Sequence, residues 1–284
     1  MIENLYPIKI IEKHAAYALV LGIAYAIIGI GVAVLLFPED PAIVAVAVIA
    51  LMFYPTITKL MRAEEHEESK NRRFNLLDFF RNHQYIFQVY LLFFLGVMLV
   101  FAFFSIVLPT LAVNHILKNQ IEILYGVTGN AIFSKSLFTS IFTNNFWVMM
   151  VIFATSFFLG EAGIFLITWN ASVWGTIFGL FAKNYALHVS QNPAYAFFLV
   201  MGIVITHTIL EAFAYISAAN AGGIISRGLV SERFGSPKFQ RVLSGTIITL
   251  LFAIVVLFIA VSVETYVLGN IHIYQEIVRY SFIK

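Results

Sequence analysis

Charged residues are scarce in this sequence of 284 residues. Only 11% are Asp, Glu, Lys or Arg, whereas 61% are hydrophobic. A soluble globular domain carries about 25% charged residues. Because a soluble chain of this size cannot bury so much apolar surface, the composition excludes an ordinary water-soluble fold. We therefore expect a multi-pass protein of the cell membrane, with the lipid bilayer as its surroundings.

Cysteine is absent, which excludes disulfide bonds, thiolate metal ligands and a catalytic thiol. The usual enzyme motifs are missing too: there is no His-Glu-x-x-His, no Gly-x-Ser-x-Gly and no Walker phosphate-binding loop. The formal net charge of +2 gives no indication of a nucleic-acid partner. The sequence therefore predicts neither an enzyme nor a bound cofactor.

Long apolar segments are what the sequence has in abundance. A membrane-spanning helix needs about 20 mainly apolar residues. The candidates are residues 16–36, 41–61, 86–111, 146–168, 169–187, 194–219 and 243–264. The most polar of them is 169–187, which is either a full span or a re-entrant segment. The predicted fold is one all-α membrane domain, residues 1–284, with about seven transmembrane helices.

Two basic loops predict the orientation of the chain. Residues 59–83 and 220–242 are both rich in Lys and Arg, and such loops stay on the cytoplasmic side. An even number of crossings must then separate them, and four predicted spans do so only if 169–187 is counted. The N-terminus is therefore predicted to be cytoplasmic.

The segments between the spans are short. Residues 62–84 carry Glu and Lys or Arg at helical spacings, which predicts a short charged cytosolic helix between the second and third spans. This helix is either a solvated extension or a docking site for a cytosolic partner. Residues 112–145 are expected to form the longest external loop, and the tail 270–284 is expected to lie in the membrane interface as an amphipathic helix.

Polar side chains inside the apolar spans form the candidate site. Ionisable groups at bilayer depth are costly and face the interior of the bundle. Glu161 lies between glycines that permit a helix break, and His207 and Glu211 are four residues apart, on one face of a helix. Asn170, with Thr168, is expected to cap the next helix. We predict that Glu161, Asn170, His207 and Glu211 form an intramembrane polar cluster.

Three interpretations of this cluster are open. Its members form interhelical hydrogen bonds that fix the packing, or handle a proton or substrate, or hold a metal ion. His207 and Glu211 would supply two metal ligands, but no third is evident, so no metal is predicted. Small residues near the cluster predict close helix packing. They are Gly160, Gly163, Gly175, Gly222 and Gly223.

The same residues resemble a known family. The motifs are Gly160-Glu161-Ala162-Gly163, the run 168–175 beginning Thr-Trp-Asn, and His207-x-x-x-Glu211 followed by Ala-Gly-Gly at 221–223. Together they resemble the stage II sporulation protein M family, and its archaeal members most of all. The family has Gly after the histidine, where this chain has Thr208. The resemblance implies a membrane anchor or assembly protein, since the namesake belongs to a complex that remodels cell wall.

Two functions follow as expectations. A membrane scaffold or assembly component is predicted first, and it requires a dry cluster in which every polar atom is paired. The alternative is a transporter or permease subunit with a polar intramembrane site at Glu161, His207 and Glu211, reached by water and served by discontinuous helices. A homodimer, the commonest closed assembly, is compatible with either function.

Overall fold

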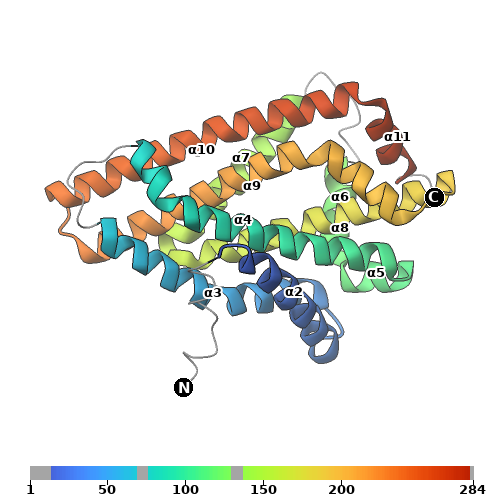
Figure 1. The fold of residues 1–284 in the computed structure, drawn as a ribbon, viewed down its shortest axis with the longest axis horizontal. Helices are drawn as coiled ribbons and strands as arrows, with labels where there is room; N and C mark the ends of the chain where they lie inside the picture. Colours follow the sequence, from blue (N-terminus) through green and yellow to red (C-terminus); the bar gives the residue numbers. More distant parts are fainter. Residues whose placement is uncertain (1–13, 69–75, 129–136, 282–284) are drawn as a thin grey trace.

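The computed structural model describes residues 14–68, 76–128 and 137–281, and every regular element in these ranges is a helix (Figure 1). The α-helices are α2 (Tyr17–Leu36), α3 (Pro41–Glu68), α4 (Leu76–Val107), α5 (Thr110–Ile116), α6 (Lys118–Thr128), α7 (Leu137–Leu159), α8 (Gly163–Val189), α9 (Pro193–Ser231), α10 (Pro237–Asn270) and α11 (His272–Tyr280). A 3-10 turn, η2 (Gly160–Ala162), joins α7 to α8. The predicted all-α fold is confirmed.

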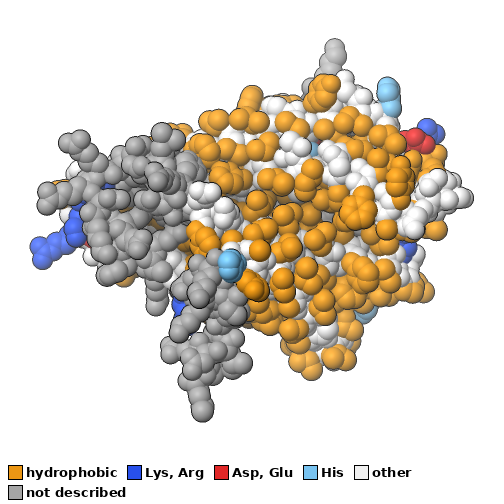
Figure 2. Space-filling view, in the orientation of Figure 1, with side chains coloured by type: hydrophobic (Ala, Val, Ile, Leu, Met, Phe, Trp, Pro, Cys, Tyr) orange, Lys and Arg blue, Asp and Glu red, His pale blue; other side chains and the backbone are white. Residues whose placement is uncertain are grey.

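Six segments of the described chain are long and apolar enough to cross a membrane, which confirms a multi-pass membrane protein. Five of them lie in α2, α3, α4, α9 and α10. The sixth, Leu137–Val189, has 53 residues. A straight helix of that length would measure about 80 Å, far more than a bilayer core of about 30 Å. The face shown in Figure 2 is covered mostly by hydrophobic side chains, as contact with lipid requires.

The long sixth segment turns back on itself at η2. Gly160 has φ +66°, a left-handed conformation that glycine adopts without steric cost. Helix α7 runs parallel to α9, because Asn145 contacts Glu211 and Phe153 lies against Gly222. Helix α8 runs antiparallel to α9, because Gly163 lies against Ala219 while Trp174 contacts Tyr215. This reversal favours two crossings, although the count of seven spans and their orientation remain predictions.

The predicted boundary between residues 146–168 and 169–187 is wrong. Helix α7 ends at Leu159 and α8 begins at Gly163, so the reversal occurs about two turns earlier than expected. Thr168 and Asn170 lie inside α8 instead of capping it, and their side chains donate to the carbonyl oxygens of Ile164 and Leu166. The glycines around Glu161 were predicted to permit a helix break, and the break lies there; the apolar runs on both sides of it shifted the predicted boundary to residue 168.

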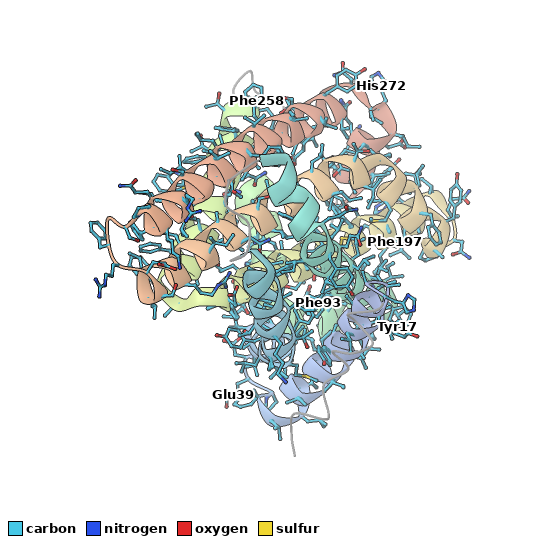
Figure 3. The ribbon with its side chains drawn as sticks, turned by 60° about the vertical axis from the view of Figure 1, so that its left-hand side comes forward. Tyr17, Glu39, Phe93, Phe197, Phe258 and His272 are labelled. Atoms are coloured by element: carbon cyan, nitrogen blue, oxygen red, sulfur yellow. The ribbon has the colours of Figure 1, made fainter. Side chains whose placement is uncertain are left out.

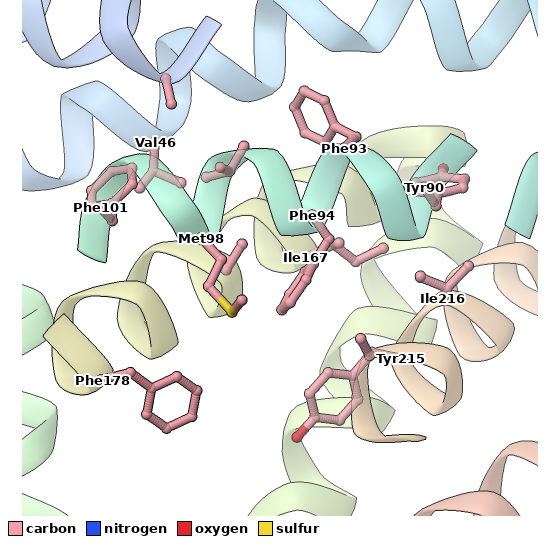
Figure 4. Packing of buried hydrophobic residues seen from close by; sticks show 14 of the residues in the cluster. Val46, Tyr90, Phe93, Phe94, Met98, Phe101, Ile167, Phe178, Tyr215 and Ile216 are labelled. Atoms are coloured by element: carbon pink, nitrogen blue, oxygen red, sulfur yellow. The ribbon is translucent and has the colours of Figure 1, made fainter. Parts of the chain in front are cut away.

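Helix α4 lies at the centre of the hydrophobic core (Figure 4). Phe93 points from α4 toward α3, where its ring stacks on that of Phe53 at 3.6 Å, whereas Phe94 and Met98 point toward α8. In the wider view of Figure 3, Phe93 is central while Glu39 and His272 lie at the periphery. The helices that carry the polar residues are therefore held by extensive apolar packing.

The segment 112–145, predicted as an external loop, is helical in its described part apart from the turn at Leu117. Helices α5 and α6 occupy most of its first half, and α7 begins at Leu137. Gln120 of α6 is fully buried, and its Nε2 donates to Ser172 Oγ of α8 at 3.2 Å. Helix α6 therefore packs into the bundle, a contact that no local sequence pattern indicates.

The two remaining predictions outside the spans have different outcomes. The tail does form a helix, α11, but its apolar residues Tyr274 and Ile277 are buried by protein instead of facing lipid. The rings of Phe181 and Tyr274 lie 6.3 Å apart, which fixes α11 against α8. For the predicted charged helix at 62–84, α3 continues to Glu68 and α4 begins at Leu76, while residues 69–75 lie outside the described chain.

Candidate functional site

Helix α9 carries a series of polar side chains through the bundle. His207 is 5% exposed, Glu211 4% and Asn220 0%, and the side chain of Arg227 is 22% exposed. From His207 to Arg227 the helix rises about 30 Å, which matches the hydrocarbon thickness of a bilayer. In Figure 1, α9 lies between α10 on one side and α4 and α8 on the other. Protein therefore surrounds these side chains.

Two carboxyl groups meet near the middle of α9. The carboxyl groups of Glu211 (α9) and Glu264 (α10) lie within hydrogen-bonding reach of each other. Asn145 of α7 adds a third helix, because its Nδ2 donates to Glu211 Oε1 at 2.9 Å. A carboxyl group donates a hydrogen bond only when it is protonated. We call Glu211 and Glu264 the carboxyl pair, and Asn145 is the amide that binds it.

Several polar atoms around the carboxyl pair have no hydrogen-bond partner among the described residues. They include Nδ1 of His207, Oε2 of Glu264 and Oγ1 of Thr265. His207 lies one turn from Glu211 on the same face of α9. Buried polar atoms are normally satisfied, so such a group is typical of a site that takes water or another small occupant. Nearby, burial and the charge of Glu264 raise the pKa of the Tyr274 phenol, which therefore stays neutral.

A second charged contact lies at the helix break. Arg227 of α9 forms an ion pair with Glu161 of η2, in which Nη1 of the arginine donates directly to Oε1 of the glutamate. The Glu161 carboxylate rests on Gly223, where a Cβ would stand only 3.0 Å from Oε2. Tyr90 of α4 lies near enough to interact electrostatically with both charges. We call Glu161 and Arg227 the break-site ion pair, since it ties the α7–α8 turn to α9.

The structure divides the predicted polar cluster. Arg227 is sixteen residues beyond Glu211 on α9, a rise of about 24 Å, so Glu161 and Glu211 belong to separate places. His207 and Glu211 do lie on one face, as the spacing predicted. Asn170 joins neither place, because its side chain is bonded to the backbone of its own helix.

The glycines singled out in the sequence have two roles. Four of them lie where helices approach closely: a Cβ at Gly163 would collide with Ser156, at Gly175 with the Met98 carbonyl, and at Gly222 with the Phe153 carbonyl. Gly223 makes room for Glu161. Gly160 has open space around it, so its positive φ is the reason for glycine there.

Sequence reasoning missed three residues of these two places. Asn145 was placed at the end of the predicted loop 112–145, Arg227 in the basic loop 220–242 and Glu264 at the end of the predicted span 243–264. For Glu264 a signal existed, because the sequence continues Thr-Tyr-Val-Leu and the helix runs on to Asn270. For Asn145 and Arg227 no local pattern distinguishes a partner in the fold from an interfacial residue.

The two places offer carboxyl, imidazole, amide and guanidinium groups, which can bind protons and small ions. Within the described ranges, no group of three or more His, Cys, Asp or Glu side chains is arranged to hold a metal ion. The metal interpretation of His207 and Glu211 therefore gains no support. What the carboxyl pair offers is a place where one proton can reside between two acids.

Comparison with known proteins identifies the chain at the level of its family. The family described as stage II sporulation protein M matches residues 18–267, which include every residue of the carboxyl pair and the break-site ion pair. No curated protein and no solved structure gives a significant match. Because the matched region covers most of the sequence, the chain belongs to the stage II sporulation protein M family.

Proposed function

We propose that this membrane protein is a transport component, a permease-like subunit that moves protons or small cations along α9. The observation that carries the proposal is the polar series on α9. His207, Glu211, Asn220 and Arg227 extend over about the thickness of a bilayer core inside a membrane-embedded bundle. Ionisable groups at such depth are costly to maintain, and they typically line ion or proton pathways.

Incomplete hydrogen bonding supports transport over a purely structural role. A scaffold with a dry cluster would pair every buried polar atom, because an unsatisfied one costs about 1–3 kcal/mol. Nδ1 of His207 and both amide atoms of Asn220 instead lack partners among the described residues. Glu211 and Asn220 are nine residues apart and lie on opposite faces of α9, so a route would pass around this helix.

Reconstitution into liposomes tests the proposal. We expect the purified protein to carry protons down an imposed pH gradient, read by a pH-sensitive dye inside the vesicles. Glu211→Gln should slow the flux by about a hundredfold or more, since a positioned proton-transfer group typically contributes at least that factor. The matched control is Glu122→Gln, at an exposed glutamate paired with Lys118.

The control variant should carry protons like the wild type. Proton, sodium and potassium fluxes that all equal those of protein-free liposomes would reject the proposal for the isolated chain. A flux that is equally fast in the wild type and in Glu211→Gln would reject the route along α9. No enzymatic step is part of the proposed function.

A second candidate is a membrane scaffold or assembly component. It is supported by the interlocking of helices at Gly175 and Gly222 and by the family's description. This function requires a partner, for which the charged segment 62–84 or a second copy of the chain is proposed. Site-specific photocrosslinking from that segment in cells tests it. A scaffold should keep its crosslinked partner in the Glu211→Gln variant, whereas loss of the partner in that variant would contradict a role independent of the acid.

A further inference from the structure

The carboxyl pair has an electrostatic problem that only a bound positive charge solves. Glu211 is buried and its carboxyl group lies within hydrogen-bonding reach of that of Glu264, whose Oε2 is buried too. Two carboxylates at hydrogen-bonding distance cannot both ionise, because like charges in a site of low polarity repel strongly. At least one proton must therefore remain between them.

The neighbours of the pair do not supply the missing charge. The titratable groups that face it are His207 and Tyr215 of α9 and Tyr274 of α11, and the group from α7 is the neutral amide of Asn145. The structure describes no Lys or Arg in contact with the pair. The phenols are neutral, so they do not replace a proton between the acids.

His207 is an independent sign of an exchangeable occupant. Its side chain is 5% exposed, it lies one turn from Glu211 on the same face, and its Nδ1 has no hydrogen-bond partner within the described chain. A buried imidazole with a free ring nitrogen, one helical turn from an acid, is able to take or return a proton. The site thus includes both a resident proton and a group that can exchange it.

We propose that Glu211 and Glu264 bind one exchangeable proton, which holds α9 against α10 and whose release separates the two helices unless a small cation replaces it. Asn145 ties the site to α7, because its amide donates to Glu211 Oε1. The inference concerns proton binding itself and does not rest on transport.

The pH dependence of stability tests the proposal. The folded protein keeps a proton that an unfolded glutamate loses above about pH 4.3. The native state therefore binds one more proton than the unfolded state, so stability falls as pH rises. We expect the folding equilibrium to weaken by up to tenfold per pH unit above that value, until the pair itself loses its proton.

The variants Glu211→Gln and Glu264→Gln keep the shape and hydrogen bonding of the pair but need no shared proton. Each should lose this slope, while Glu122→Gln should retain it. The second measurement is infrared spectroscopy of the intact wild type in lipid nanodiscs, which reads the protonated carboxyl band directly and needs no variant to fold. A protonated band near neutral pH that is lost in both variants supports the proposal.

Three outcomes would overturn it. Equal slopes in the wild type and both variants would show that the pair holds no proton, and so would the absence of a protonated carboxyl band near neutral pH. Thermal stabilisation of the wild type by sodium, lithium or potassium, absent in both variants and without such a band, would assign the site to a metal cation instead. If the protonated carboxyl band is present but the liposomes show no proton flux, the proton-binding site is supported and the transport function is rejected.

Discussion

At the scale of single residues, position and not composition decides what a polar or small side chain does. Glu161, at the turn between two apolar helices, pairs with Arg227, whereas Glu211 and Glu264, inside apolar helices, pair with each other. The Glu161–Arg227 pair has no net charge when the carboxylate is ionised, whereas the Glu211–Glu264 pair must bind a proton to form a hydrogen bond between its carboxyl groups. Residues of the same type therefore have different chemistry within one bundle.

Gly160 offers a prediction at this scale. Gly160→Ala places a Cβ in open space, so its only cost is the left-handed backbone, about 1–2 kcal/mol. We expect thermal unfolding in detergent to shift down accordingly. The matched control is Gly202→Ala, which is also in open space but lies inside α9. Because alanine favours a helix over glycine by about 1 kcal/mol, the control should be neutral or stabilising. Equal shifts for both variants would contradict a conformational role for Gly160.

At the scale of helices, side chains join elements at the ends where the backbone is unsatisfied. Lys183 of α8 donates from Nζ to the carbonyl oxygen of Leu108 at 2.5 Å, just before Pro109 and after the end of α4. Carbonyls at a helix C-terminus lack intrahelical partners, and a lysine there satisfies one of them. The contact links the end of α4 to α8.

Lys183→Met should therefore destabilise the protein. It keeps the apolar stem but leaves the Leu108 carbonyl without its donor, which costs about 1–3 kcal/mol. Chemical or thermal unfolding in detergent measures the loss. The control, Lys118→Met, removes an exposed lysine whose contact with Glu122 spans 3.9 Å. It should change stability by less than about 1 kcal/mol. A neutral Lys183→Met would show that the carbonyl is solvated instead.

The break-site ion pair gives a second prediction for helices. Removing one charge, as in Glu161→Gln or Arg227→Met, takes from the other charge its direct ion-pair contact. Each single variant should lose about 3 kcal/mol, at the lower end for a buried pair because Arg227 is partly exposed. The double variant should be more stable than the sum of the single losses predicts. Additive losses in this double-mutant cycle would mean that the two charges do not stabilise each other.

At the scale of the whole molecule, the reversal at η2 decides how often the chain crosses the membrane. If α7 and α8 cross separately, five crossings lie between Glu39 and Ser236: α3, α4, α7, α8 and α9. If Leu137–Val189 crosses once, only four lie between them. The two positions then lie on opposite sides in the first case and on the same side in the second.

Cysteine labelling distinguishes these cases directly, because the chain has no cysteine of its own. Single variants Glu39→Cys and Ser236→Cys are treated in intact cells with a membrane-impermeant maleimide. We expect only Glu39→Cys to react, since the basic loop near Ser236 is predicted to be cytoplasmic. Labelling of both or neither, with both reactive after lysis, would reject the seven-span topology. Labelling of Ser236→Cys alone would invert the predicted orientation.

The sequence by itself determined the class of the protein and much of its helical framework. Low charge and long apolar segments leave a bilayer as the only surroundings in which this chain can bury its surface. The spacing of His207 and Glu211 placed them on one face, because helical periodicity is a local property. The motifs around Glu161 and His207 were sufficient to indicate the family, which the match over residues 18–267 then established.

Only the tertiary structure decided which polar residues meet. Glu211 accepts a hydrogen bond from Asn145, which is 66 residues away, and Glu161 forms an ion pair with Arg227, also 66 residues away. Such partners depend on how whole helices cross, and helical periodicity carries no information about a neighbouring helix. The glycines around Glu161 indicated a possible break, but hydropathy misplaced the boundary between the two spans for a related reason: apolar segments continue on both sides of the turn. The polar partners and the span boundary were missed for one physical reason: the apolar sequence that lipid requires determines which segments form helices, whereas the contacts between helices depend on packing.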